Sequence, residues 1–136
     1  MKIIVCLDDR NGMLFHNRRQ SSDRILCGKI MELAGESTLW MHPYSQKLFD
    51  ATAQNICIAP LFLRQAQQGE YCFVETEDVS AYATSIEEII IFRWNRTYPG
   101  DFFFPMELLK NFQKKDDVLT FCGNSHDKIT MEVFTR

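Results

Sequence analysis

Short apolar segments of strand length alternate along the chain with short segments suited to helices. Residues 2–7 (KIIVCL) form a continuous apolar run, which is typical of a strand buried on both faces of a sheet. At the other end, residues 118–122 and 128–135 flank a polar connection and predict an antiparallel hairpin. Strands that alternate with helices and close on antiparallel strands predict an α/β fold with a mixed sheet.

Apolar runs, capping residues and helix-stopping glycines predict the remaining elements. Further strands are predicted over residues 38–41, 55–59, 70–74 and 88–94. Helices are predicted over residues 23–34, 43–49, 60–68, 77–83 and 106–114. Residues 8–20 contain Asn11-Gly12 in a polar mixture, which predicts a loop. Its basic run, residues 16–19, is expected to be a solvated surface.

Composition narrows the class of protein. The length of 136 residues predicts a single domain that spans residues 1–136. Fifteen Lys and Arg against 18 Asp and Glu give a net charge of −3, which indicates no nucleic-acid partner. Five cysteines without a CxxC pair indicate free thiols in a reducing compartment, so we expect a cytoplasmic protein. No apolar run approaches the ~20 residues that cross a bilayer, so no membrane segment is predicted.

Titratable residues offer few candidates for chemistry. The three histidines have none of the spacings of metal ligands, so no metal site is predicted. Asp8-Asp9 follows the first strand, where carboxylates can bind Mg²⁺, but a solvated strand end is the preferred interpretation. His126-Asp127 lies in the hairpin connection, where polar residues serve a turn. A Cys–His nucleophile pair stays open, because nothing in the sequence selects one cysteine.

Several motifs, in order along the chain, resemble the dihydrofolate reductase family. Residues 86–105 (IEEIIIFRWNRTYPGDFFFP) resemble a late strand and the Gly-Asp-x-x-Phe-Pro turn that follows it. The opening KIIVCLDDRNGML is similar to the first strand and its Gly-containing loop, and NSHDKITMEVFTR to the closing hairpin. TLWMHPYSQKLF lies where the family has Met-Gly-Arg-x-Thr. The resemblance implies a dihydrofolate reductase-like mixed sheet of about seven or eight strands, flanked by short helices.

The positions that would bind NADPH in that family are mostly replaced. After the strand at residues 70–74, the family has a Gly-Gly pair beside the cofactor pyrophosphate. This chain has Glu75-Thr76-Glu77-Asp78 instead, and its carboxylates would repel a phosphate. The Arg that pairs with the NADPH phosphate is replaced within Met41-His42-Pro43-Tyr44-Ser45. The resemblance therefore implies a degenerate NADPH site, and no cofactor is predicted.

Other positions keep groups that suit a ligand. Asp23 matches the carboxylate that orients and helps to protonate a pterin ring, although an acid here also caps a helix. Phe92 stands where the family has a Thr that supports this acid. The further candidates for ligand binding, on the first loop and at a possible anion-binding corner, are Gly12, Asn17, Arg18, His42 and Ser45.

These observations support one preferred hypothesis and two alternatives. The preferred hypothesis is a divergent, non-reductase protein that binds a small heterocyclic molecule or a partner between the first helix and the sheet, anchored by Asp23. The first alternative is an NAD(P)H-dependent reductase of a pterin or pyrimidine-like substrate. It predicts that Asp23→Asn abolishes turnover and changes stability by less than about 1 kcal/mol. The second is a structural role, such as a homodimer with a cleft filled by its own Phe side chains. Whether Cys27 faces the cleft stays open.

Overall fold

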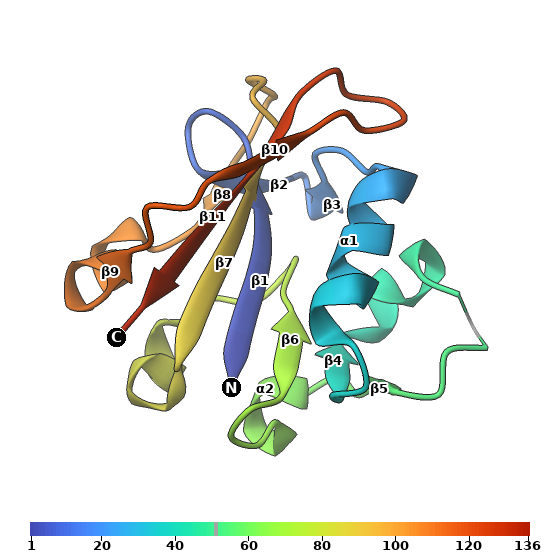
Figure 1. Cartoon of the computed structure of the whole chain (residues 1–136), viewed down its shortest axis with the longest axis vertical. Helices are drawn as coiled ribbons and strands as arrows, with labels where there is room; N and C mark the ends of the chain where they lie inside the picture. Colours follow the sequence, from blue (N-terminus) through green and yellow to red (C-terminus); the bar gives the residue numbers. More distant parts are fainter. Residues whose placement is uncertain (51) are drawn as a thin grey trace.

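The computed structural model describes residues 1–50 and 52–136, and its centre is a twisted mixed sheet (Figure 1). Within these residues the sheet has eight strands. They are β1 (Lys2–Leu7), β4 (Leu39–Met41), β5 (Ile56–Ile58), β6 (Tyr71–Phe73), β7 (Glu88–Arg93), β9 (Gln113–Lys114), β10 (Leu119–Phe121) and β11 (Ile129–Thr135). Their order is β10-β11-β7-β1-β6-β4-β5, and β9 also pairs with β11. The predicted mixed sheet is confirmed.

The strand β1 lies in the middle of this sheet, as its apolar run predicts. It pairs in parallel with β6 on one side and with β7 on the other. The long closing strand β11 runs antiparallel to β7 and β10, which makes the sheet mixed. The carboxyl ends of β1 and β7 therefore lie at the same edge, and the chain segments that leave them meet there.

Helical segments are shorter than the sequence predicts. The α-helices are α1 (Arg24–Ala34) and α2 (Phe62–Gln65), and the 3₁₀ segments are η1 (Pro43–Leu48), η2 (Ser80–Ser85) and η3 (Met106–Asn111). The helix expected over residues 60–68 keeps only four residues, and the helix expected over residues 77–83 is a 3₁₀ turn that begins later. The end of the helix expected over residues 106–114 is β9, because Gln113 and Lys114 pair with β11.

The prediction of a loop over residues 8–20 is wrong. This segment contains β2 (Gly12–Phe15) and β3 (Arg18–Arg19), which form a small sheet with β8 (Phe102–Phe103). His16 and Asn17 join β2 to β3 with φ of 50° and 63°, the left-handed backbone that a two-residue hairpin turn requires. The polar composition hid this hairpin, since its apolar strand is only four residues long.

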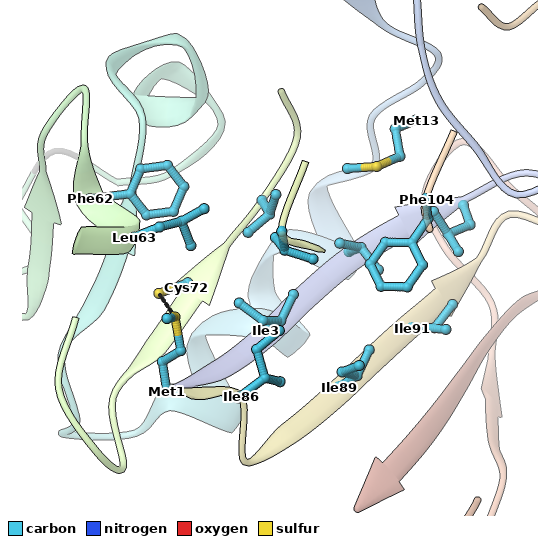
Figure 2. Close-up of a cluster of buried hydrophobic side chains, with 14 of the residues drawn as sticks. Met1, Ile3, Met13, Phe62, Leu63, Cys72, Ile86, Ile89, Ile91 and Phe104 are labelled. Atoms are coloured by element: carbon cyan, nitrogen blue, oxygen red, sulfur yellow. Dashed lines mark hydrogen bonds between the residues drawn. The ribbon is translucent and has the colours of Figure 1, made fainter. Parts of the chain in front are cut away.

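Apolar side chains alternate between the two faces of the sheet and build a core on each. Figure 2 shows the first core, in which Ile3 of β1 lies beside Ile89 and Ile91 of β7. The second core lies under α1, whose Leu26 and Ile30 are buried against the opposite face of the same strands. The amino end of α1 thereby reaches the edge where the connection between β10 and β11 passes (Figure 1).

Candidate functional site

Asp23 caps the amino end of α1 and is buried. Its backbone is extended, and its Oδ1 accepts hydrogen bonds from the backbone N–H groups of Ile25 (2.9 Å) and Leu26 (3.2 Å). Its side chain has no solvent-exposed surface. This is the capping role that the sequence allowed beside the ligand role.

The same carboxylate also holds the connection between β10 and β11. The backbone N–H groups of Asn124 and Ser125 donate to it at 3.1 and 2.9 Å, and Ser125 Oγ lies 3.1 Å from Oδ2. Gly123 passes so close that a Cβ there would lie 2.2 Å from Oδ2. Burial raises the pKa of Asp23, but the N–H groups of Ser125 and Asn124 outweigh it and hold the pKa well below its usual range. Both oxygens are used within the chain, which argues against a ligand-anchoring role.

His126 is the second buried member of this cluster. Its Nδ1 lies 3.2 Å from Asp23 Oδ2, and its ring stacks on Trp94 with the centroids 4.4 Å apart. Its Nε2 lies 3.1 Å from Ser21 Oγ and 2.9 Å from Tyr98 Oη. The interpretation of His126 as a simple turn residue is wrong, because the connection folds over Trp94 and buries the imidazole.

Glu75 is paired within the chain. Its carboxylate forms a two-pronged ion pair with Arg19, with Nε–Oε2 at 2.9 Å and Nη2–Oε1 at 3.0 Å. Ser45 Oγ donates to the same carboxylate at 2.8 Å, and the Arg19 guanidinium lies over the Tyr44 ring at 4.3 Å. The basic run is therefore not simply solvated, and Arg19 is its inward-facing member.

The predicted anion-binding corner is used internally. His42 Nδ1 accepts a hydrogen bond from the backbone N–H of Tyr44 at 3.0 Å and so begins η1. The buried Ser45 hydroxyl is held by Glu75. The anion at this corner is thus a carboxylate of the chain itself.

Side chains fill the space between α1 and the sheet. The remaining hollow has a volume of about 10 Å³, about the space that one water molecule needs. The residues that close it include Leu26, Cys27, Leu48, Phe73, Glu75 and Trp94. Cys27 therefore faces this space, and burial, followed by the charge of Glu75, raises its pKa to about 11. A thiol with that pKa is protonated at neutral pH and is a poor nucleophile.

A larger hollow lies on the other side of the β2–β3 hairpin. Its volume is about 500 Å³, and we call it the outer hollow. Its lining residues come from the hairpin and from the turn after β7: Phe15, His16, Arg18, Arg19, Gln20, Tyr98 and Pro99. The outer hollow thus combines aromatic rings with basic side chains.

Buried polar bonds fix the wall of the outer hollow. Asp8 is buried and accepts hydrogen bonds from the backbone N–H groups of Gly12 (2.8 Å) and Tyr98 (3.0 Å), so the solvated-strand-end interpretation is wrong for Asp8, whereas Asp9 is exposed as expected. Gln20 Nε2 donates to Asp8 Oδ2 at 3.2 Å and to the Pro99 carbonyl at 3.1 Å. These two acceptors fix the orientation of the amide, and the buried Gln20 Oε1 has no partner within residues 1–50 and 52–136.

Arg18 lines the outer hollow, and Asn17 lies beside it at the tip of the hairpin. Gly12 lies behind the wall, where a Cβ would meet Gln20 Nε2 at 2.5 Å. The sequence reasoning missed Gln20 and Tyr98, since no spacing marks two residues so far apart in the chain as neighbours. In the part of the chain that is described, no three His, Cys, Asp or Glu side chains are grouped to hold a metal ion. None of the helices described there has the length and apolar character of a membrane span.

Comparison with known proteins gives one kind of match. No protein-family model matches the chain, and no curated protein sequence does. Among solved structures, the chain is similar to dihydrofolate reductase from Enterococcus faecalis complexed with NADP(H) and RAB-propyl. The TM-score is 0.69 at 11% identity, over 99% of this chain and 95% of that one. The chain has the dihydrofolate reductase fold. The fold implied by the sequence motifs is confirmed, and the space between α1 and the sheet is the cleft in which we expected a ligand.

Proposed function

We propose that this chain is a non-reductase protein with the dihydrofolate reductase fold that binds a small anionic aromatic molecule in the outer hollow. The observation that carries the proposal is a contrast in volume between the spaces. The closed hollow between α1 and the sheet holds about 10 Å³, and the space at its mouth between α1 and η1 holds about 230 Å³, whereas the outer hollow holds about 500 Å³. A volume of that size is within the range of small-molecule sites.

The lining of the outer hollow defines the class of ligand. Arg18 is exposed and has no ion-pair partner among the described residues, so its guanidinium is free for a carboxylate or phosphate. The Phe15 ring, which is 38% exposed, offers an apolar face beside Tyr98. An aromatic ring with an anionic group matches both features.

The residues around the cleft do not fit NADPH. A pyrophosphate needs free backbone N–H groups and small residues, whereas Glu75 brings a carboxylate that Arg19 and Ser45 hold in place. Only 9% of the Glu75 side chain is exposed, so it cannot turn aside without breaking a buried ion pair. These contacts support the absence of a dinucleotide site.

Titration with 4-aminobenzoate, followed by NMR of the ¹⁵N-labelled protein, tests the proposal. This probe carries a carboxylate, a ring and an amine donor. We expect saturable shifts at the amides of residues 15–20, Tyr98 and Gly100, with a Kd of about 1 mM or tighter. Arg18→Ala should weaken binding about fivefold, the upper end for an exposed ion pair.

Two matched probes separate the contributions. Aniline lacks the anion for Arg18 and should bind more weakly than 4-aminobenzoate, whereas benzoate keeps both the ring and the anion and should bind about as tightly. Shifts that map to the cleft at Leu26 and Trp94, or an Arg18→Ala variant with unchanged affinity, would contradict the proposal.

A further inference from the structure

We propose that Ser21, His126 and Asp23 form a nucleophilic triad that attacks small acyl esters, with Ser21 Oγ as the nucleophile. Ser21 Oγ lies 3.1 Å from His126 Nε2, and His126 Nδ1 lies 3.2 Å from Asp23 Oδ2. The two distances connect the three side chains in the order hydroxyl, imidazole, carboxylate. This is the arrangement that activates a serine hydroxyl, and it is recognised by geometry rather than by sequence position.

The surroundings set the protonation state that a triad needs. Asp23 is ionised, because hydrogen-bond donors hold its pKa well below its usual range. An ionised carboxylate only accepts hydrogen bonds, so the His126 proton lies on Nδ1, and Nε2 is free to accept. Stacking on Trp94 fixes the ring in that orientation. A buried carboxylate that orients an imidazole in this way presents Nε2 to the Ser21 hydroxyl.

Exposure differs along the triad as the chemistry requires. Asp23 and His126 are buried, with 3% of each residue exposed, whereas Ser21 is only half-buried. The base and its carboxylate are therefore shielded from water, whereas Ser21 keeps partial access to solvent. Tyr98 Oη, at 2.9 Å from Nε2, shares the same base and connects the triad to the wall of the outer hollow.

The reaction is a two-step acyl transfer. Ser21 Oγ forms a bond to the ester carbonyl carbon while its proton moves to His126 Nε2. The bond from that carbon to the leaving oxygen then breaks, and Nε2 returns the proton to the leaving alcohol. Water next attacks the acylated Ser21, gives its proton to Nε2 and releases the acid, and Ser21 recovers its hydrogen.

Labelling with a fluorophosphonate ester separates this role from a purely structural one. In the labelling step Ser21 Oγ bonds to phosphorus and fluoride leaves. We expect one adduct per chain by intact-mass spectrometry, located on Ser21 by peptide mapping. Ser21→Ala should lower the labelling rate by about 100-fold or more, which is the scale of general-base activation.

Ser22→Ala is the matched control, because it removes the adjacent exposed hydroxyl and should label like the parent protein. Circular dichroism and urea unfolding check that both serine variants fold. Hydrolysis of 4-nitrophenyl acetate gives a second readout and should fall in Ser21→Ala only. An unlabelled parent protein, an adduct on Tyr98, or equal labelling of Ser21→Ala would overturn the proposal.

Discussion

Replacing Asp23 with alanine is expected to lower the free energy of unfolding by about 3–5 kcal/mol, because several buried donors lose their acceptor at about 1–3 kcal/mol each. The carboxylate accepts bonds from α1 and from the β10–β11 connection. Its loss leaves the N–H groups of Asn124 and Ser125 without an acceptor and removes the partner of His126. Urea unfolding at pH 7, followed by circular dichroism, measures the change.

Asp127→Ala is the control for this variant, because Asp127 lies in the same connection but is exposed and has no recorded polar contact among the described residues. It should change stability by less than about 0.5 kcal/mol. Asp23→Asn keeps one acceptor oxygen but turns an NH₂ toward donors, so its cost should exceed about 1 kcal/mol. The reductase alternative expects Asp23→Asn to change stability by less than about 1 kcal/mol, so a larger cost would contradict that alternative. For Asp23→Ala, a loss of stability below about 1 kcal/mol would refute the role of Asp23 in the buried hydrogen-bond network.

The hydrogen bonds that Asp23 accepts also predict how the free energy of unfolding changes in acid. The pKa of Asp23 is lowered in the folded protein, so its stabilising contribution is present above the unfolded pKa of about 4. The contribution falls as the pH drops below that value and is lost once the folded carboxyl is protonated. Unfolding free energies measured from pH 7 down to pH 2 should fall more steeply for the parent protein than for Asp23→Ala.

Phe92→Ala is expected to cost about 3–5 kcal/mol, the usual range for a fully buried Phe. Phe92 lies in β7 between β1 and β11, has no exposed surface and packs edge-on against Phe121. Phe92→Thr, which introduces the residue of the reductase family, should cost a similar amount. Its hydroxyl enters an apolar core, and Asp23, which that Thr would support, already has its full set of donors.

Phe92→Leu is the control because it keeps a large apolar side chain at this position. Such a hydrophobic replacement should cost less than about 1.5 kcal/mol. Urea unfolding of the three variants at pH 7 provides the comparison. A Thr variant as stable as the parent protein would show that this part of the cleft tolerates a polar group, contrary to the packing described above.

Much of the fold could be predicted from the sequence. The continuous run of β1, the alternation in β11 and the order of turn motifs each depend on neighbouring residues, and these local patterns survive in the structure. The β2–β3 hairpin was missed because its strands are short and its turn is formed by His16 and Asn17 rather than glycine. Element type was therefore predictable where an apolar pattern was long enough to show its period.

The site was less predictable, because its contacts join distant parts of the chain. Nothing local marks Glu75 as the partner of Arg19, or His126 as the partner of Asp23. The sequence placed unpaired carboxylates after β6, whereas the fold neutralises Glu75 internally. Arg18 could be selected from its place in the first loop, but Gln20 was recognised as part of the wall only from its contacts with Asp8 and Pro99.

We propose that side chains close the cleft of this fold to a dinucleotide, and a thermal-unfolding titration with NADPH tests this proposal. A ligand present at 100 times its Kd adds about 2.7 kcal/mol to the stability of the folded state, which would raise the unfolding temperature by several degrees. We predict no saturable shift at millimolar NADPH. A saturable NADPH shift of that size would contradict the claim and restore the reductase alternative.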